Sequence, residues 1–486
     1  MADDREYMKS IPLPSGRRAD EVHVAADRET WQEIVNKLNA QAPAEACTFA
    51  LTRPSVGVSR TTVIVREVIW PRAGEVVATP HALEISADYI SRALDIAIDA
   101  GPMVGLCLVH THPRSEWGEG IARFSPRDDW YERRLFPTIL GARPQALSAS
   151  IVLGSAGDID ARIWWQEDKA VLTQPAFAVR VVGPELTILE TPSSPWRDHP
   201  DPSVMDRSTR LWGREGRRRL QNFRIGIVGA GGTGSLSIFA LATMGVGNLR
   251  VWDKDIAHKQ NRHRTVGITA EYVGRAKVEA LKAFAESVAT AEPFLIEVHE
   301  AWGTTDEGLR SLKDCDIVFC CVDKFAPRVP LNDLAYAHLI PVLDMASWMH
   351  PDKNKKIDAL MTHAHVWSPG IPCAWCRETL TSYGLTKEAQ GRQQGIEKRV
   401  PYGLPLEDTD GVEPSVLPLN MLGVSLALME FMQVGLKITD RTPNDLKFIL
   451  PEWELDESDR RVRDNCGCIM SLGAADTLRI RPVLME

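Results

Sequence analysis

A glycine-rich turn that follows an apolar segment constrains the fold of this chain more than any other feature. The apolar segment begins at Phe223, and a stretch of small residues typical of a helix comes after the turn. The turn contains four glycines: Gly229, Gly231, Gly232 and Gly234. Glycines let such a turn close tightly and let backbone N–H groups approach a phosphate at the helix N-terminus. The sequence therefore predicts a βαβ unit that binds a nucleotide, and this turn alone leaves an NAD-dependent dehydrogenase open.

The chain of 486 residues is long enough for two or three domains. We expect an α/β domain over residues 20–170, a proline-rich connecting segment over 171–204 that is part strand and part linker, and an α/β domain over 205–486. A formal charge of −9 gives no reason to expect nucleic-acid binding. The N-terminus lacks a basic-then-apolar signal pattern, and no apolar run reaches membrane-spanning length, so we expect a cytoplasmic protein without membrane contact.

Hydrophobic spacing predicts the elements of the first domain. Helices are expected over residues 29–38 and 87–100, the second ending at Gly101-Pro102. Strands are expected over residues 47–52, 61–69, 103–109, 148–153 and 161–165. The apolar strand over 103–109 is followed directly by His110.

A group of polar residues after that strand has the composition of a catalytic zinc site. His110 and His112 are two residues apart in extended chain, so both imidazoles point to the same side and can reach one metal ion. Asp128 supplies a carboxylate, and two histidines with one carboxylate leave a fourth position for water. Glu45 is the candidate general base, and Ser125 is the candidate donor to an oxyanion.

These residues resemble the pattern of the JAMM/MPN-plus metallopeptidases, in which a distant Glu precedes H-[ST]-H-P and then S-x-x-D. The resemblance covers the first third of the chain and implies zinc held by His110, His112 and Asp128, with Glu45 as base and Ser125 as oxyanion support. The stretch between His112 and Ser125 is longer than in that family. Its length keeps Asp129 as an alternative ligand, although the S-x-x-D spacing favours Asp128. A scaffold-type MPN domain without activity is the alternative.

The second domain resembles the ThiF and ubiquitin-activating family. The glycine turn is followed by D-x-D at Asp253 and Asp255, then by N-x-x-R and a distal lysine. The resemblance covers residues 205–480 and implies ATP and Mg²⁺ as cofactors, with Asp253 as the ribose-binding acid and Asp323 as the acid that holds Mg²⁺. It further implies nucleotide contacts from the turn glycines and from the following residues: Asp255, Asn261, Arg264, Lys277 and, across a homodimer interface, Arg207.

Four of the nine cysteines form two close pairs, C-x-x-C at Cys373 and Cys376 and C-x-C at Cys466 and Cys468. Four thiolates can hold a closed, structural zinc, whereas a disulfide or unrelated core thiols are the alternatives. Residues 377–411 contain no cysteine, although the family's thioester-forming members carry one in that segment. We therefore expect a domain that adenylates its substrate without forming a thioester of its own.

His363 and His365 also have a spacing of two residues. With no acid near them in the sequence to complete a ligand set, an alternating surface strand is the expected explanation.

The two resemblances together imply an enzyme of a ubiquitin-like modifier pathway. The peptidase would mature or deconjugate a β-grasp modifier, and the second domain would adenylate the modifier's C-terminal glycine. A conjugating enzyme that supplies the acceptor cysteine is a further candidate partner. Two alternatives are a peptide-adenylating and processing enzyme of natural-product biosynthesis and a degenerate scaffold protein.

Overall fold

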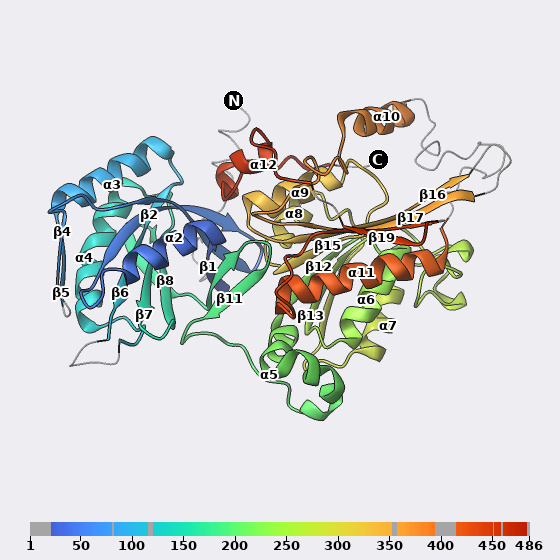
Figure 1. Ribbon diagram of the computed structural model, residues 1–486, viewed down its shortest axis with the longest axis horizontal. Coiled ribbons are helices and arrows are strands. Elements are labelled where there is room, and N and C mark those ends of the chain that lie inside the picture. Colours follow the sequence, from blue (N-terminus) through green and yellow to red (C-terminus); the bar gives the residue numbers. More distant parts are fainter. Residues whose placement is uncertain are drawn as a thin grey trace. The chain divides into compact units, whose positions relative to one another are not determined.

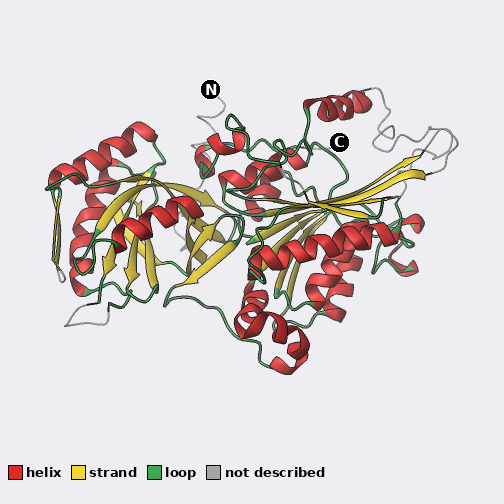
Figure 2. Ribbon diagram, in the orientation of Figure 1, coloured by secondary structure: helices red, strands yellow, loops and turns green. Residues whose placement is uncertain are grey.

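The computed structural model describes residues 21–79, 82–114, 120–351, 357–393, 415–450, 452–457 and 460–483. The chain divides into two compact units (Figure 1). One unit runs to Pro195 and includes Ala337–Leu339 and Ser471–Arg479, while the other contains Trp196–Tyr336, Ile340–Met470 and the residues from Ile480 onward. Both units are α/β, as the patterns of strands and helices in the sequence predict (Figure 2).

The first unit is built on a nine-stranded sheet with the order β11-β10-β1-β3-β2-β6-β7-β8-β9. β6 is a central strand that pairs antiparallel with β2 and parallel with β7, and it carries both candidate histidines. The strands are β1 (Glu21–Asp27), β2 (Cys47–Val56), β3 (Arg60–Ile69), β6 (Gly105–His112), β7 (Ser148–Gly154), β8 (Ile159–Glu167), β9 (Ala170–Pro175), β10 (Ala178–Val182) and β11 (Leu186–Glu190). A separate hairpin pairs β4 (Val76–Thr79) with β5 (Ala82–Ile85).

Helices cover both faces of this sheet, so the unit has three layers. α2 (Arg28–Asn39) packs Trp31, Ile34 and Leu38 into the core of one face. α3 (Ala87–Ala100) and α4 (Pro126–Ala142) pack against the other face. Each of the three helices begins at a side-chain cap, which satisfies otherwise free backbone N–H groups of its first turn. The caps are Asp27, Ser86 and Ser125.

The expected connecting segment over residues 171–204 is strand in its first part. β10 pairs parallel with β1 and antiparallel with β11, so these strands extend the sheet of the first unit. The two units meet in sequence at Pro195 and Trp196. The 3₁₀ turn η1 (Pro202–Met205) and the helix α5 (Asp206–Asn222) come next, and α5 bends at Gly213, whose φ is 73°.

The second unit is built on an eight-stranded sheet with the order β14-β13-β12-β15-β16-β17-β18-β19. Pairing is parallel from β14 to β16 and antiparallel from β16 to β19. The strands are β12 (Arg224–Val228), β13 (Asn248–Trp252), β14 (Leu295–His299), β15 (Ile317–Cys320), β16 (Val342–Pro351), β17 (Ile357–Trp367), β18 (Asp445–Leu450) and β19 (Glu454–Glu457). In such parallel sheets, ligands bind beyond the carboxyl ends of the strands.

Helices cover both faces of the second sheet within that unit (Figure 1). The helix α11 packs on β16 and β17 and against α6, and α7 packs on β14. Among the described residues, α11 is the helix with the length and apolar composition to cross a membrane, but 61% of its most apolar window is buried. The helices are α6 (Gly232–Thr243), α7 (Lys277–Val288), α8 (Asp306–Leu312), α9 (Arg328–Ala337), α10 (Ser382–Gln393), α11 (Leu417–Leu436) and α12 (Gly467–Met470), with 3₁₀ turns at Lys259–Asn261, Ala270–Tyr272 and Ala475–Thr477.

Candidate functional sites

The first site lies where β6 ends and α4 begins. Nε2 of His110 lies 3.3 Å from Oδ1 of Asp128, and Nε2 of His112 lies 3.4 Å from Oδ2 of the same carboxylate. A tetrahedral ion with bonds of 2.0–2.1 Å holds its donor atoms about 3.4 Å apart. The structure therefore brings His110, His112 and Asp128 together with the separations that a single zinc ion needs.

Each histidine offers Nε2 to this site. Nδ1 of His112 lies 3.2 Å from the carbonyl oxygen of Ile121, and a proton on Nδ1 would leave the lone pair of Nε2 for a metal. His110 is buried, and neither of its ring nitrogens has a hydrogen-bond partner among the described residues. Buried polar atoms normally have partners, so Nε2, which faces the Asp128 carboxylate at 3.3 Å without a hydrogen bond, fits a site that a metal ion would occupy.

Asp128 takes its position from the start of α4. Oγ of Ser125 accepts a hydrogen bond from the backbone N–H of Asp128, and Oδ2 of Asp128 accepts one from the N–H of Ser125 at 2.6 Å. This capping box orients the carboxylate toward the histidines. The neighbouring Asp129 forms an ion pair with Arg162 at 2.5 Å instead. Of the two candidate carboxylates, the geometry favours Asp128.

Glu45 lies just before β2, at the same end of the sheet. Thr111, between the two histidines, holds this segment, because its Oγ1 accepts from the N–H of Ala46 at 2.9 Å and its own N–H donates to the carbonyl of Ala46. Burial raises the pKa of Glu45, and the nearby charges of His112 and His110 partly oppose that effect. A carboxyl group with a raised pKa beside a metal-type donor set has the properties of a general base. Zinc, when bound, supplies a Lewis acid that polarises a carbonyl and acidifies water.

The second site is the glycine turn between β12 and α6. Gly229 has φ 95°, and a Cβ on it would lie 2.7 Å from the carbonyl oxygen of Cys321. A Cβ on Gly234 would lie 2.0 Å from the carbonyl oxygen of Gly229, so only glycine fits there. Gly231 caps α6 without a side chain, and a Cβ on it would meet no atom within 4 Å. The backbone at Gly231 can therefore be approached by a phosphate group, whereas Gly232 is covered by Asn420, whose Nδ2 would lie 2.4 Å from a Cβ there.

Two acids and a lysine follow the neighbouring strand β13. Oδ2 of Asp253 accepts from the N–H of Ala230 in the turn at 2.6 Å, and burial raises the pKa of Asp253. Asp255 pairs with Lys277, whose Nζ lies 2.7 Å from Oδ2. These contacts place Asp253, Asp255 and Lys277 beside the glycine turn.

Asn261 and Arg264 lie in one backbone turn, in which the N–H of Arg264 donates to the carbonyl oxygen of Asn261 at 3.0 Å. Asn261 is buried, and its Oδ1 accepts from the N–H of His258. Oγ of Ser235 accepts from the N–H of Val266, which ties the Arg264 segment to the first turn of α6. Asp323 follows the end of β15 and is exposed, so its carboxylate can hold Mg²⁺. Arg207 lies exposed in the first turn of α5, and its contact across a dimer stays a prediction.

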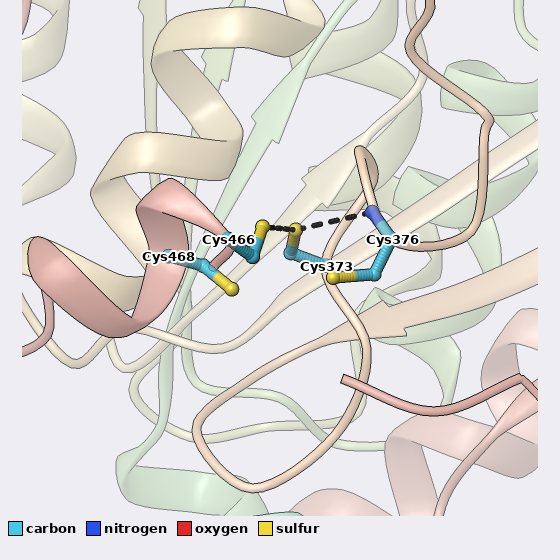
Figure 3. A group of neighbouring side chains, drawn as sticks. All are labelled: Cys373, Cys376, Cys466 and Cys468. Atoms are coloured by element: carbon cyan, nitrogen blue, oxygen red, sulfur yellow. Dashed lines mark hydrogen bonds between the residues drawn. The ribbon is translucent and has the colours of Figure 1, made fainter. Parts of the chain in front are cut away.

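The four cysteines near the C-terminus lie together (Figure 3). The four sulfur atoms all lie within 4.8 Å of one another, and Sγ of Cys373 and Sγ of Cys466 are 3.4 Å apart. A disulfide bond is about 2.05 Å long, so these sulfurs are not paired. The backbone N–H of Cys376 donates to Sγ of Cys373, and the backbone N–H of Arg463 donates to Sγ of Cys376. The cluster is consistent with a structural zinc site.

The expectation for His363 and His365 was wrong in two respects. His365 is buried, so β17 is not a surface strand at this point. Asp344, from the neighbouring strand β16, lies beside both rings and supplies the acid that the nearby sequence lacks. Only the pairing register of β16 and β17 brings this carboxylate to the histidines, and sequence spacing does not reveal that register.

Comparison with known proteins identifies part of the chain. Residues 205–376 match the ThiF family. The probable adenylyltransferase/sulfurtransferase MoeZ of Mycobacterium tuberculosis is 31% identical over 25% of this chain and 31% of its own length. The SAMP-activating enzyme E1 of Haloferax volcanii is 34% identical over 27% of this chain and 48% of its own length. The chain thus spans less than half the length of these relatives.

Among solved structures, Escherichia coli MccB in a complex with AMPCPP and MccA covers 56% of this chain and 75% of its own, with a TM-score of 0.42 and 15% identity. The ThiF match covers residues 205–376. It therefore includes Arg207, the glycine turn, and the acidic and basic residues around that turn. Residues 205–376 are therefore similar to the ThiF family, and they include the parallel strands and the glycine turn of a Rossmann-like fold.

Proposed function

We propose that this chain is a bifunctional enzyme of a ubiquitin-like modifier pathway. The first unit would be a zinc peptidase that exposes the modifier's C-terminal glycine or removes the modifier from conjugates. The second unit would adenylate that glycine with ATP. The observation that carries the proposal is the presence, in one chain, of a ThiF-family domain and a donor set of the zinc-peptidase type.

In the peptidase unit, each residue has a separate task. His110, His112 and Asp128 would hold the zinc ion, and Glu45 would take a proton from the attacking water and pass it to the leaving amine. The hydroxyl of Ser125 accepts from the N–H of Asp128 and keeps its own proton for donation to a developing oxyanion.

In the adenylating unit, the substrate carboxylate would attack the α-phosphate of ATP. A carboxylate oxygen–phosphorus bond forms, the bond to the β-phosphate breaks, and pyrophosphate leaves. Arg264 and Lys277 would offset the negative charge that the phosphates develop, with Arg207 as a further cation from a second subunit. Asp323 would hold Mg²⁺, which neutralises phosphate oxygens.

We further propose that the chain forms no thioester. All nine cysteines are buried, and four of them form the zinc-type cluster. Burial raises the pKa of Cys47 and Cys321 to about 12, so their reactive thiolate forms are scarce at neutral pH. The acyl adenylate would then pass to a cysteine on another protein, such as a conjugating enzyme, or to a different nucleophile.

A trapping experiment tests the absence of a thioester. The protein would be incubated with ATP and a β-grasp protein that ends in glycine and comes from the same genome. We expect the protein to release pyrophosphate from ATP as the acyl adenylate forms. We expect no covalent adduct that dithiothreitol removes. Such an adduct, lost when a particular cysteine is replaced, would contradict this part of the proposal.

The second candidate substrate is a short peptide rather than a folded modifier. The lack of cysteine over residues 377–411 favours it, because adenylation of a peptide needs no thioester carrier. The rate of pyrophosphate exchange distinguishes the two substrates. A C-terminal peptide that stimulates exchange as strongly as the whole β-grasp protein would favour the peptide as substrate. The adenylating site is expected to require the folded protein.

A further inference from the structure

A third group of metal-binding side chains lies on the sheet of the second unit, formed by Asp344 of β16 and His363 and His365 of β17. His365 lies directly opposite Asp344 in the pairing register, and on its other side it lies opposite Asp445 of β18. His363 is two residues before His365, so its side chain projects from the same face of the sheet. Three neighbouring strands thus bring two imidazoles and two carboxylates to one place.

The separations match those of a metal site. Oδ2 of Asp344 lies 3.3 Å from Nε2 of His363 and 3.9 Å from Nδ1 of His365. One ligand atom from each of the three residues lies within 4.8 Å of the others. Oδ1 and Oδ2 of Asp128 lie 3.3 and 3.4 Å from the imidazoles of the first unit, so the two groups are similar in scale.

The surroundings orient each donor atom. Nε2 of His365 lies 2.5 Å from Oδ1 of Asp445, so a proton held between them leaves a lone pair on Nδ1, which lies 3.9 Å from Oδ2 of Asp344. Metal-bound histidines commonly have such a carboxylate on the far ring nitrogen. Nε of Arg328 donates to Oδ1 of Asp344 at 2.8 Å, so the Asp344 oxygen nearer the histidines is Oδ2.

The neighbouring cations lie on the outer sides of the carboxylates. Nη1 of Arg377 lies 3.4 Å and Nζ of Lys447 lies 3.7 Å from Oδ2 of Asp445, while Arg328 lies on Oδ1 of Asp344. Asp344 and His365 are buried, whereas 14% of the His363 side chain is exposed. An ion and its further ligands can therefore approach from the side of His363.

From this geometry we propose that Asp344, His363 and His365 form a binding site for a divalent transition-metal ion, with zinc as the ion expected. Two imidazoles and one carboxylate leave at least one coordination position for water or for an oxygen ligand such as a carboxylate. Oγ1 of Thr379 lies 3.1 Å from Nδ1 of His365, and an ion bound to Nδ1 would replace this hydrogen bond. The site is separate from the four cysteines and from the His110 group, and it does not depend on the proposed function.

Metal content of the full-length protein tests this site. Wild type, His363→Gln and a control would be loaded with excess zinc, desalted and measured by mass spectrometry. The control is His299→Gln, in the same sheet. Nε2 of His299 also lies 3.3 Å from a carboxylate oxygen, Oε1 of Glu297, but His299 belongs to none of the three groups of possible metal ligands among the described residues. We expect His363→Gln to retain one zinc equivalent fewer than wild type and His299→Gln to retain the same number. Equal zinc in all three proteins would overturn the proposal.

Cobalt spectroscopy of a second variant keeps the test independent of how well His363→Gln folds. In His110→Gln the first zinc site is removed while β16 and β17 are unchanged. Cobalt bound to nitrogen and oxygen has weak visible bands, whereas cobalt bound to four thiolates has strong ultraviolet charge-transfer bands. We expect His110→Gln to retain one cobalt of the nitrogen–oxygen type. Cobalt of the thiolate type alone would show that Asp344 and His363 form only an ion pair.

Discussion

At the scale of single residues, Glu45 is the side chain on which the proposed peptidase chemistry depends. Replacing it with glutamine removes the base but keeps the size of the side chain and leaves the three metal-type donors in place. We expect Glu45→Gln to lower the rate of precursor cleavage by about 10²–10⁴-fold. A cleavage assay on a β-grasp protein with a C-terminal extension measures this loss, and zinc content measured in parallel should be unchanged. Cleavage at the wild-type rate would assign the base to another group.

If Asp253 binds the ribose as proposed, nucleotide binding is expected to depend on pH. Burial raises its pKa, so this carboxylate takes up a proton at a higher pH than an ordinary aspartate does. The protonated form loses the charge that strengthens a hydrogen bond from a ribose hydroxyl. We expect the Kd for ATP to rise as the pH falls through this raised pKa, and Asp253→Asn to bind more weakly with a flatter pH profile. Calorimetric titrations between pH 5 and 8 measure both; equal pH profiles would contradict the assignment.

Much of the candidate chemistry at this scale is predictable because it depends on local spacing. His110 and His112 are two residues apart on one strand, so their side chains share a face. The capping box links Ser125 to Asp128 within one helical turn. The group formed by Asp344, His363 and His365 could not be predicted in this way. Its carboxylate comes from another strand, and a one-residue slip in the register of β16 and β17 would turn it to the opposite face.

At the scale of elements, the start of α4 couples helix stability to the metal site. Ser125→Ala removes the cap, which costs about 1 kcal/mol, and it also frees the Asp128 carboxylate to move. Ser86→Ala removes the matching cap of α3, 3.2 Å from the N–H of Tyr89, away from the metal-type donors. We expect both variants to lose similar stability in urea denaturation, but only Ser125→Ala to bind zinc more weakly. Equal zinc affinity in the two variants would show that the Ser125 cap does not position Asp128 for zinc binding.

The glycine turn offers a second matched pair. Gly234→Ala would force a Cβ against the carbonyl oxygen of Gly229, and overpacking of this kind costs about 1–3 kcal/mol. Gly231→Ala meets open space and has φ −80°, so its cost in stability should stay below about 1 kcal/mol. Urea denaturation followed by circular dichroism compares the two. If Gly231→Ala is the more destabilising, the geometry described for the turn is wrong.

The elements themselves were largely predictable where hydrophobic spacing is regular. The expected helix over residues 87–100 corresponds to α3, and the strand expected over residues 61–69 corresponds to β3. Residues 171–204 were expected to be part strand and part linker, but which residues form strand was not predictable, because β10 depends on its pairing with β1 and β11. Such long-range pairing leaves no local signal.

At the scale of the whole molecule, the division into two units implies that the two proposed activities can be removed separately. The grouping of Ser471–Arg479 with the first unit could not be expected from spacing, because it depends on long-range packing of the turn Ala475–Thr477 on β2. One contact there is the hydrogen bond from the N–H of Val56 to Oδ2 of Asp476 at 2.7 Å. The zinc-type donors and Glu45 belong to the first unit, and the glycine turn and Asp323 belong to the second. A variant in one site should therefore leave the chemistry of the other intact.

The most direct test measures pyrophosphate exchange into ATP with two forms of one β-grasp protein, a precursor with residues beyond its glycine and the mature form. The account predicts that wild type supports exchange with both forms, that Glu45→Gln supports exchange only with the mature form, and that Asp323→Ala cleaves the precursor but supports no exchange. Exchange by Glu45→Gln with the intact precursor, or by Asp323→Ala with either form, would contradict two successive activities on one protein tail.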